Sequence, residues 1–169
     1  MEHPMKKLLL SVGAIVVALS IVVGAASATR TSSSIGAKVS VAQTGLGRVL
    51  VDGRGHTLYL FAKDTRGKTT CAGACAAYWP PLIATGKSLA GSGVKSTLLG
   101  TTRRPDGRLQ VTYNHHPLYA FAKDAKNGQT NGEELNTFGG EWYAVSAAGI
   151  KVKNAPNTTT GATGSDSGY

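Results

Sequence analysis

Short apolar runs separated by glycine-rich polar turns make up most of this chain. Residues 38–42 alternate polar and apolar side chains, and residues 48–51, 57–62 and 109–113 are rich in apolar, β-branched or aromatic residues. Short runs of this kind, bounded by turn residues, are typical of strands. The Asp-Gly-Arg-Gly stretch at 52–55 predicts a hairpin turn between the second run and the third. The pattern therefore predicts an all-β fold.

One phrase of the chain occurs twice. Residues 58–64 read Leu-Tyr-Leu-Phe-Ala-Lys-Asp, and residues 118–124 repeat them with a single change, Leu60 to Ala120. Side chains alternate across a strand, so the Tyr and Phe of each copy share one face and the aliphatic residues take the other. Two apolar faces predict a central strand in each copy. The motif residues are Tyr59, Phe61, Asp64, Tyr119, Phe121 and Asp124.

The duplication predicts two pseudo-symmetric β-repeats. Each repeat has about 60 residues, which is marginal for an independent fold, so we expect the two to share one core. We assign repeat one to residues 38–100 and repeat two to residues 101–153, with 83–105 as a connector that holds at most one short strand.

Asp64 and Asp124 stand where each apolar run ends. An aspartate in this place is expected to accept hydrogen bonds from backbone N–H groups of the following turn. The alternative is a carboxylate that binds a cation or acts as a base. A hydrolase that pairs Asp64 with Asp124 would require the fold to bring the two together.

The segments before and after these repeats have different compositions. Residues 1–28 predict a secretory signal peptide, because Lys6 and Lys7 precede an apolar stretch and Ala26-Ser27-Ala28 fits a cleavage site. Retention of the stretch as a membrane anchor is the alternative, since it approaches the ~20 residues that span a bilayer. Residues 29–37 predict a flexible leader, and residues 154–169 a disordered tail. The leader predicts a secreted or extracytoplasmic protein.

Cys71 and Cys75 are the two cysteines of the chain. In an exported protein such a pair is most simply a disulfide. The alternative is a redox or metal site, in which the two thiolates bind a soft metal ion with help from His56, His115 or His116. The simpler interpretation of the histidines is that they are surface turn residues, because no further ligand stands at a recognisable spacing, and no cofactor is predicted.

Aromatic and acidic residues further along the chain have simpler expected roles. Trp79 is followed by two prolines, so we expect it to enter the core from a rigid segment, with Trp142 as its counterpart. An exposed sugar-binding Trp79 is the alternative. Adjacent carboxylates do not face one another in regular structure, so Glu133 and Glu134 are expected to be solvated.

The chain is basic, with 18 Lys and Arg against 9 Asp and Glu and a net charge of +9. Removal of residues 1–28 takes away two basic residues and one acidic residue, which leaves +8. Such a domain is attracted to polyanions outside the membrane: anionic cell-envelope polymers or lipid head groups. Specific nucleic-acid binding is not expected, and membrane contact is expected only through the signal segment. The candidate basic surface consists of Arg54, Lys63, Arg66, Lys68, Lys123 and Lys126.

The doubled Tyr-x-Phe-x-x-Asp motif, with Cys-x-x-x-Cys and Trp-Pro-Pro after its first copy, resembles the bacterial family called "secreted repeat of unknown function". The resemblance covers roughly residues 40–148 and implies export and a repeat architecture, with no catalytic residue. Many members are lipoproteins with a cysteine just after the signal. This chain has no cysteine there, which argues against a lipid anchor.

These observations favour a secreted, non-catalytic binding or structural β-repeat module of the cell envelope. The alternative is an extracytoplasmic redox or metal-binding protein that uses Cys71 and Cys75. An enzymatic activity has no support from the motifs, because no nucleophile and base stand at a recognisable spacing.

Overall fold

The computed structural model describes residues 37–153. The predicted signal peptide, nearly all of the predicted leader and the predicted tail lie outside the described residues. Inside this range the chain is almost wholly β-structure with one short α-helix, which confirms the predicted all-β class. No helix between residues 37 and 153 has the length and apolar character needed to cross a membrane.

The elements are short and follow one another closely. In chain order they are β1 (Lys38–Thr44), β2 (Gly47–Asp52), β3 (Tyr59–Phe61), α1 (Ala74–Tyr78), β4 (Leu89–Ala90), the 3-10 helix η1 (Ser96–Leu98), β5 (Leu99–Arg103), β6 (Leu109–Tyr113), β7 (His116–Pro117), β8 (Asn136–Thr137) and β9 (Gly140–Ala144).

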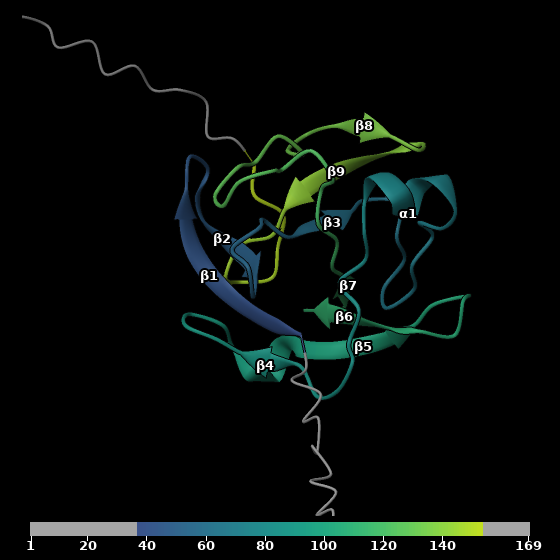
Figure 1. Cartoon of the computed structure of the whole chain (residues 1–169), viewed down its shortest axis with the longest axis horizontal. Helices are drawn as coiled ribbons and strands as arrows, with labels where there is room; N and C mark the ends of the chain where they lie inside the picture. Colours follow the sequence, from purple (N-terminus) through teal and green to yellow (C-terminus); the bar gives the residue numbers. More distant parts are fainter. Residues whose placement is uncertain (1–36, 154–169) are drawn as a thin grey trace, which may run out of the picture. The chain divides into compact units, whose positions relative to one another are not determined.

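The strands form three small sheets. β1 lies between β2 and β4, β9 lies between β3 and β8, and β6 lies between β5 and β7. Isolated bridges connect the sheets, among them Val49 with Ser146 and Tyr59 with Tyr119. Figure 1 shows the sheets on different sides of a common interior, with α1 at one end of it.

The two copies of the repeated phrase meet at Tyr59 and Tyr119. Each of these residues donates its backbone N–H to the carbonyl of the other, at 2.8 and 3.0 Å. The first copy forms β3 against β9. The second copy lies in the same way against residues 78–82, where the N–H of Ala122 donates to the carbonyl of Tyr78.

The second copy is not a regular strand, which differs from the prediction. Its neighbouring segment contains Pro80 and Pro81, which have no N–H to donate, so the ladder is interrupted and only isolated bridges remain at Tyr119. The alternation of faces nevertheless holds in both copies. Tyr59 and Phe61 lie in one core cluster, whereas Leu58 and Leu60 lie in the other.

The core consists of two clusters, and each contains residues from both predicted repeats. The first holds most of the aromatic side chains, together with Cys71 and Cys75. The second is mainly aliphatic and includes Leu50, Leu58, Val111 and Leu118. The two halves therefore share their core, as the size of each repeat suggested.

The helix α1 was not predicted, and the connector holds more structure than expected. The helix α1 is a single five-residue turn, too short to show a helical period. The connector, expected to hold at most one short strand, contains both β4 and β5, and β5 pairs with β6 along its whole length. The sequence of β5, Leu-Gly-Thr-Thr-Arg, is mostly polar, and its residues are half-buried or exposed, so it lacks the apolar–polar alternation by which a strand is recognised.

Candidate functional site

Four aromatic rings form a continuous stack through the centre of the described domain. Trp79 and Trp142 lie at the middle with ring centroids 3.8 Å apart and planes 1° from parallel. Phe61 stacks on Trp142 at 4.1 Å, and Phe121 stacks on Trp79 at 4.4 Å. Each repeat thus contributes one Phe and one Trp, and each Phe packs on the Trp of the other repeat. Trp79 and Trp142 are fully buried, as predicted for Trp79.

The rings of the two motif tyrosines lie nearly perpendicular to the stacked rings. Tyr59 meets Trp79 at 5.4 Å and Tyr119 meets Trp142 at 5.1 Å, both in T-shaped contacts. Such pairs contribute about 0.5–1.5 kcal/mol each beyond the burial of their area. The indole N–H groups of both tryptophans donate to Thr137, one to its side-chain oxygen and one to its carbonyl.

Each tyrosine donates its hydroxyl proton to the aspartate of the other repeat. The Tyr59 hydroxyl lies 2.6 Å from Oδ2 of Asp124, and the Tyr119 hydroxyl lies 2.7 Å from Oδ2 of Asp64. The Tyr–Asp hydrogen bond is therefore formed twice between the repeats, once in each direction. Burial of the rings, together with the adjacent carboxylates, raises the pKa of both tyrosines, so the phenols stay protonated.

The second oxygen of each aspartate holds the loop that follows it. Oδ1 of Asp64 accepts the N–H and the hydroxyl proton of Thr70, and Oδ1 of Asp124 accepts the N–H of Asn131. These are the hydrogen bonds to the following turn that the sequence predicted. Burial raises the pKa of Asp64, while its bonds from Tyr119 and Thr70 oppose that shift.

The two loops also contact the opposite repeat through their backbones. Gly67 donates to the carbonyl of His115, and Gly128 donates to the carbonyl of Gly55. Each loop thus rests on the hairpin turn that precedes the other copy of the motif. The aspartates consequently fix both loops on the shared core.

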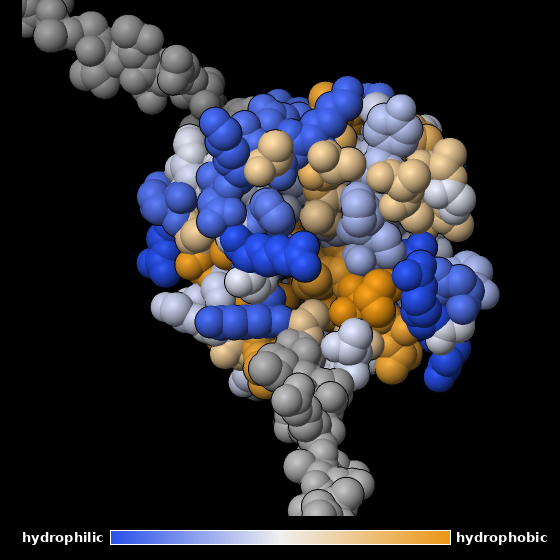
Figure 2. Space-filling model, in the orientation of Figure 1, coloured by the Kyte–Doolittle hydropathy of each residue, from blue (hydrophilic) through white to orange (hydrophobic). Residues whose placement is uncertain are grey.

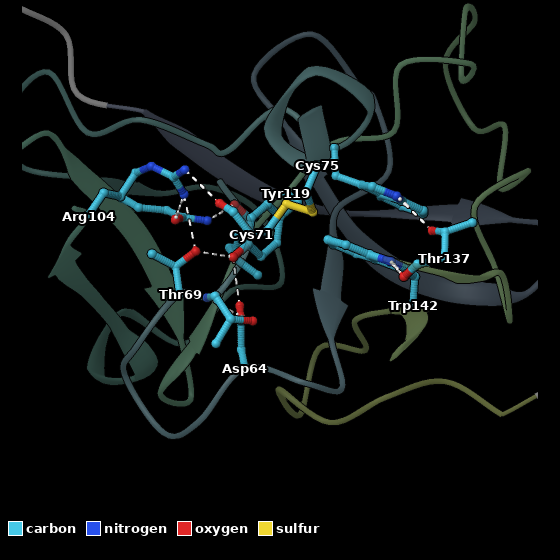
Figure 3. The surroundings of a disulfide bond; sticks show 12 residues. Asp64, Thr69, Cys71, Cys75, Arg104, Tyr119, Thr137 and Trp142 are labelled. Carbon is cyan, nitrogen blue, oxygen red and sulfur yellow. Dashed lines mark hydrogen bonds between the residues drawn. A yellow bond between two sulfur atoms is a disulfide. The ribbon is translucent and has the colours of Figure 1, made fainter. Parts of the chain in front are cut away.

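A polar network on one side of this core was not predicted (Figure 3). Arg104 is buried and donates to the carbonyl of Cys71, to Oε1 of Gln110 and to the hydroxyl of Thr69. Thr69 in turn contacts the hydroxyl of Tyr119. Arg104 stands beside a second arginine in a turn sequence, so the residue pattern gave no sign of its burial. The corresponding residues of repeat one, 60 positions earlier, are Thr44 and Leu50.

Cys71 and Cys75 form the predicted disulfide, with their Cα atoms 5.3 Å apart. Both residues are buried in the cluster that contains the aromatic stack (Figure 3). The bridge closes the segment that leads into α1 and Trp79. In this state the cysteines offer no thiolate to a metal ion.

The three candidate histidines lie in separate settings. His56 has its Nδ1 3.4 Å from Asp52, whereas His115 is exposed in the turn between β6 and β7. His116 is half-buried, and burial lowers its pKa. Among residues 37–153, no three His, Cys, Asp or Glu side chains converge in a way that would hold a metal ion.

Glu133 is not simply solvated, which corrects the prediction. Its Oε2 accepts the backbone N–H of Ala144 at 2.6 Å, while its Oε1 is buried and has no hydrogen-bond partner in the described part. Burial raises the pKa of Glu133 to about 7. Its neighbour Glu134 is exposed, as expected.

The side chains of the predicted basic surface are all exposed. Lys63 and Lys123 stand near the ends of the two motif copies, Arg66 and Lys68 lie in the loop after the first copy, and Lys126 lies in the loop after the second. Arg54 lies in the turn against which the second loop rests. Between residues 37 and 153, the ion pairs of lysine and arginine involve only Arg104 and Arg108, so these six cations are unpaired. Figure 2 shows hydrophilic side chains over much of one face, with an apolar area among them.

These features define a duplicated all-β module whose repeated motif joins its two halves. A family model described as "secreted repeat of unknown function" matches residues 40–83 and 100–146, more than half of the chain. The chain belongs to this family, as its motifs indicated, and is thereby placed among secreted, extracytoplasmic proteins. No curated protein and no solved structure matches the chain.

Proposed function

We propose that this secreted protein is a non-catalytic binding module that holds anionic polymers of the cell envelope. The observation that carries the proposal is the set of six exposed, unpaired cations on loops that the buried motif holds in place. A preformed arrangement of cations loses little conformational entropy when it binds a polyanion.

The state of the motif residues supports a structural role for them rather than a catalytic one. Both tyrosines are protonated donors inside the core, and both aspartates have each carboxylate oxygen hydrogen-bonded. A general base needs a free lone pair directed at a substrate. The carboxylate oxygens of Asp64 and Asp124 are already engaged with the core and with the following loops, which favours the structural role.

Binding to an anionic polymer through the basic loops can be tested by co-sedimentation with cell-wall polymer over a range of salt concentrations. We expect retention at low salt that falls steeply as salt rises, because the contacts are exposed and screened. The variant Lys68→Glu/Lys126→Glu should lose most of this retention.

The matched control is Lys87→Glu/Lys95→Glu, which changes the net charge equally at exposed lysines outside the motif loops. Equal loss in both variants would show that net charge alone is responsible. Retention that ignores salt would refute the proposal, and retention by anionic vesicles instead of polymer would identify lipid as the partner.

Redox exchange at Cys71 and Cys75 is the less supported alternative. Exchange requires a thiolate to reach one sulfur of the bridge. The two cysteines are only 1% and 6% exposed, which hinders that approach.

A further inference from the structure

A cleft of about 520 Å³ opens beside α1 at one end of the aromatic stack. Its size is within the range of small-ligand sites. Its lining comes from three separate parts of the chain: the end of α1 with Trp79, the second motif copy, and the β8–β9 hairpin with Leu135 before it. The side chains that matter for its chemistry are Tyr78, Trp79, Phe121, Lys123, Thr137 and Phe138.

The walls of this cleft are exposed aromatic rings. Tyr78 is 52% exposed and Phe138 is 41% exposed, and their ring centroids are 5.8 Å apart. Trp79 and Phe121, which are buried members of the stack, also line the cleft. A flat ligand ring can therefore pack on aromatic surfaces that the fold already holds in place.

The backbone conformation at Phe138 indicates that the turn itself does not favour a phenylalanine at this position. Phe138 and Gly139 form the two-residue connection between β8 and β9, with φ of 57° and 80°. A turn with two positive φ values favours Asn-Gly or Gly-Gly, and a bulky residue in the first position is strained. Residues held in strained conformations cluster at binding and active sites.

The polar groups of the cleft are one cation and one hydroxyl. Lys123 is exposed and forms no ion pair with any residue of the described range. The ammonium group of Lys63 lies near the same hairpin, 3.3 Å from where a Cβ on Gly139 would stand, but does not line the cleft. The oxygen of Thr137 accepts the indole N–H of Trp79, which orients this hydroxyl within the cleft.

We propose that this cleft binds a hexuronate residue of an acidic polysaccharide. The C–H face of the pyranose ring packs on Tyr78 and Phe138, and the carboxylate pairs with Lys123. An acyl chain would leave the ammonium group and the hydroxyl of the cleft unmatched, whereas a hexuronate satisfies the aromatic, cationic and hydroxyl groups together. This inference rests on the proposed function and specifies the sugar unit that the module recognises.

The test is titration of the full secreted chain with trigalacturonate and with its neutral counterpart, galactotriose, at moderate salt. Wild-type protein should bind trigalacturonate saturably and galactotriose at least ten-fold more weakly. Phe138→Asn should weaken trigalacturonate binding at least ten-fold. This variant keeps the hairpin, because Asn-Gly is the favoured pair for such a turn. Lys123→Gln should remove the preference for the charged sugar.

Ile150→Asn is the matched control, since Ile150 is an exposed apolar side chain outside the cleft. It should bind as wild type does. The inference is wrong if wild-type protein shows no saturable binding of trigalacturonate, if Phe138→Asn binds it as well as wild type does, or if the neutral sugar binds equally.

These outcomes separate the inference from the proposed function. If polymer retention depends on Lys68 and Lys126 but trigalacturonate does not bind, the cleft assignment fails and the basic-loop binding stands. If trigalacturonate binds and depends on Phe138 while the lysine variants retain polymer normally, the cleft stands and the basic-loop assignment fails.

Discussion

Asp64 and Asp124 each use their two carboxylate oxygens for different partners. One oxygen accepts the tyrosine hydroxyl of the other repeat, and the other accepts a backbone N–H of the following loop. A single side chain therefore joins the core to a surface loop. The equivalence of the two aspartates means that the duplicated motif has the same structural role twice.

Gly132 stands where the packing of this core leaves no room for a side chain. A Cβ at this position would lie 2.9 Å from the rings of both Tyr59 and Trp79. Because both rings are buried and packed against other aromatic rings, neither can move aside. We expect Gly132→Ala to lower the free energy of unfolding by about 1–3 kcal/mol, as overpacking does.

Chemical denaturation measures this effect. Gly45→Ala is the control, because a Cβ there has no atom within 4 Å and the backbone needs no positive φ. Equal stability of the two variants would contradict the packing described around Gly132.

Glu133 predicts a specific pH dependence of stability. Its pKa in the folded state is about 7, above the ordinary value of 4.5, so folding favours the protonated form. The stabilisation is complete below the ordinary pKa and is lost as pH rises through 7. Glu133→Gln keeps an oxygen for the N–H of Ala144 and removes the titration.

The measurement is the difference in unfolding free energy between wild type and Glu133→Gln across pH 4 to 8. Taking this difference cancels the contribution of the histidines to the pH dependence of stability. His116 would otherwise oppose the effect of Glu133, because its pKa is lowered in the folded state and its contribution to stability rises with pH. We expect wild type to lose stability relative to the variant as pH rises. A flat difference would show that Glu133 is solvated after all.

At the level of elements, α1 is held mainly by its connections. The helix has five residues, no side-chain cap and a single buried residue, Cys75. Isolated helices of this length are unstable in water. The disulfide, which joins Cys75 of the helix to Cys71 before it, and the burial of Trp79 after the helix therefore position α1, and with it one wall of the aromatic cleft.

Removal of the disulfide should accordingly have a local effect and a moderate cost. For so short a loop, the entropy of closure contributes about 2 kcal/mol. We expect Cys71→Ala/Cys75→Ala to lose about that much stability and to exchange the amide hydrogens of α1 faster, while β1 and β2 stay protected.

Reductant provides the control for this prediction. It should destabilise the wild-type protein and leave the double variant unchanged. Two free thiols in protein purified from the exported fraction would contradict the disulfide itself.

At the scale of the whole molecule, the sequence was most informative where one residue type has one usual role. The alternation in residues 58–61 assigned Tyr59 and Leu58 to different faces, and the proline-flanked Trp79 was placed in the core, because burial follows from side-chain character. The disulfide followed from the spacing of two cysteines in an exported chain. The family resemblance rested on the same doubled motif.

The contacts between residues of different repeats could not be predicted from residue type and spacing. Spacing shows that Tyr59 and Asp124 belong to two copies of a motif, but not which aspartate receives which hydroxyl. The burial of Arg104 depends on Gln110, Thr69 and the carbonyl of Cys71, which come together only in three dimensions. The same holds for the burial of Glu133, which lies in a turn while its partner Ala144 is on β9.

The central claim is that the repeated motif joins the two halves, because the tyrosine of each copy donates its hydroxyl proton to the aspartate of the other copy. A pair of double-mutant cycles tests this claim most directly. The first cycle combines Tyr59→Phe with Asp124→Asn, and the second combines Tyr59→Phe with Asp64→Asn, all measured by denaturant unfolding. The structure predicts a coupling of about 1–2 kcal/mol in the first cycle and additivity within about 0.5 kcal/mol in the second. Coupling of Tyr59 to Asp64 in its own repeat, with none to Asp124, would contradict it.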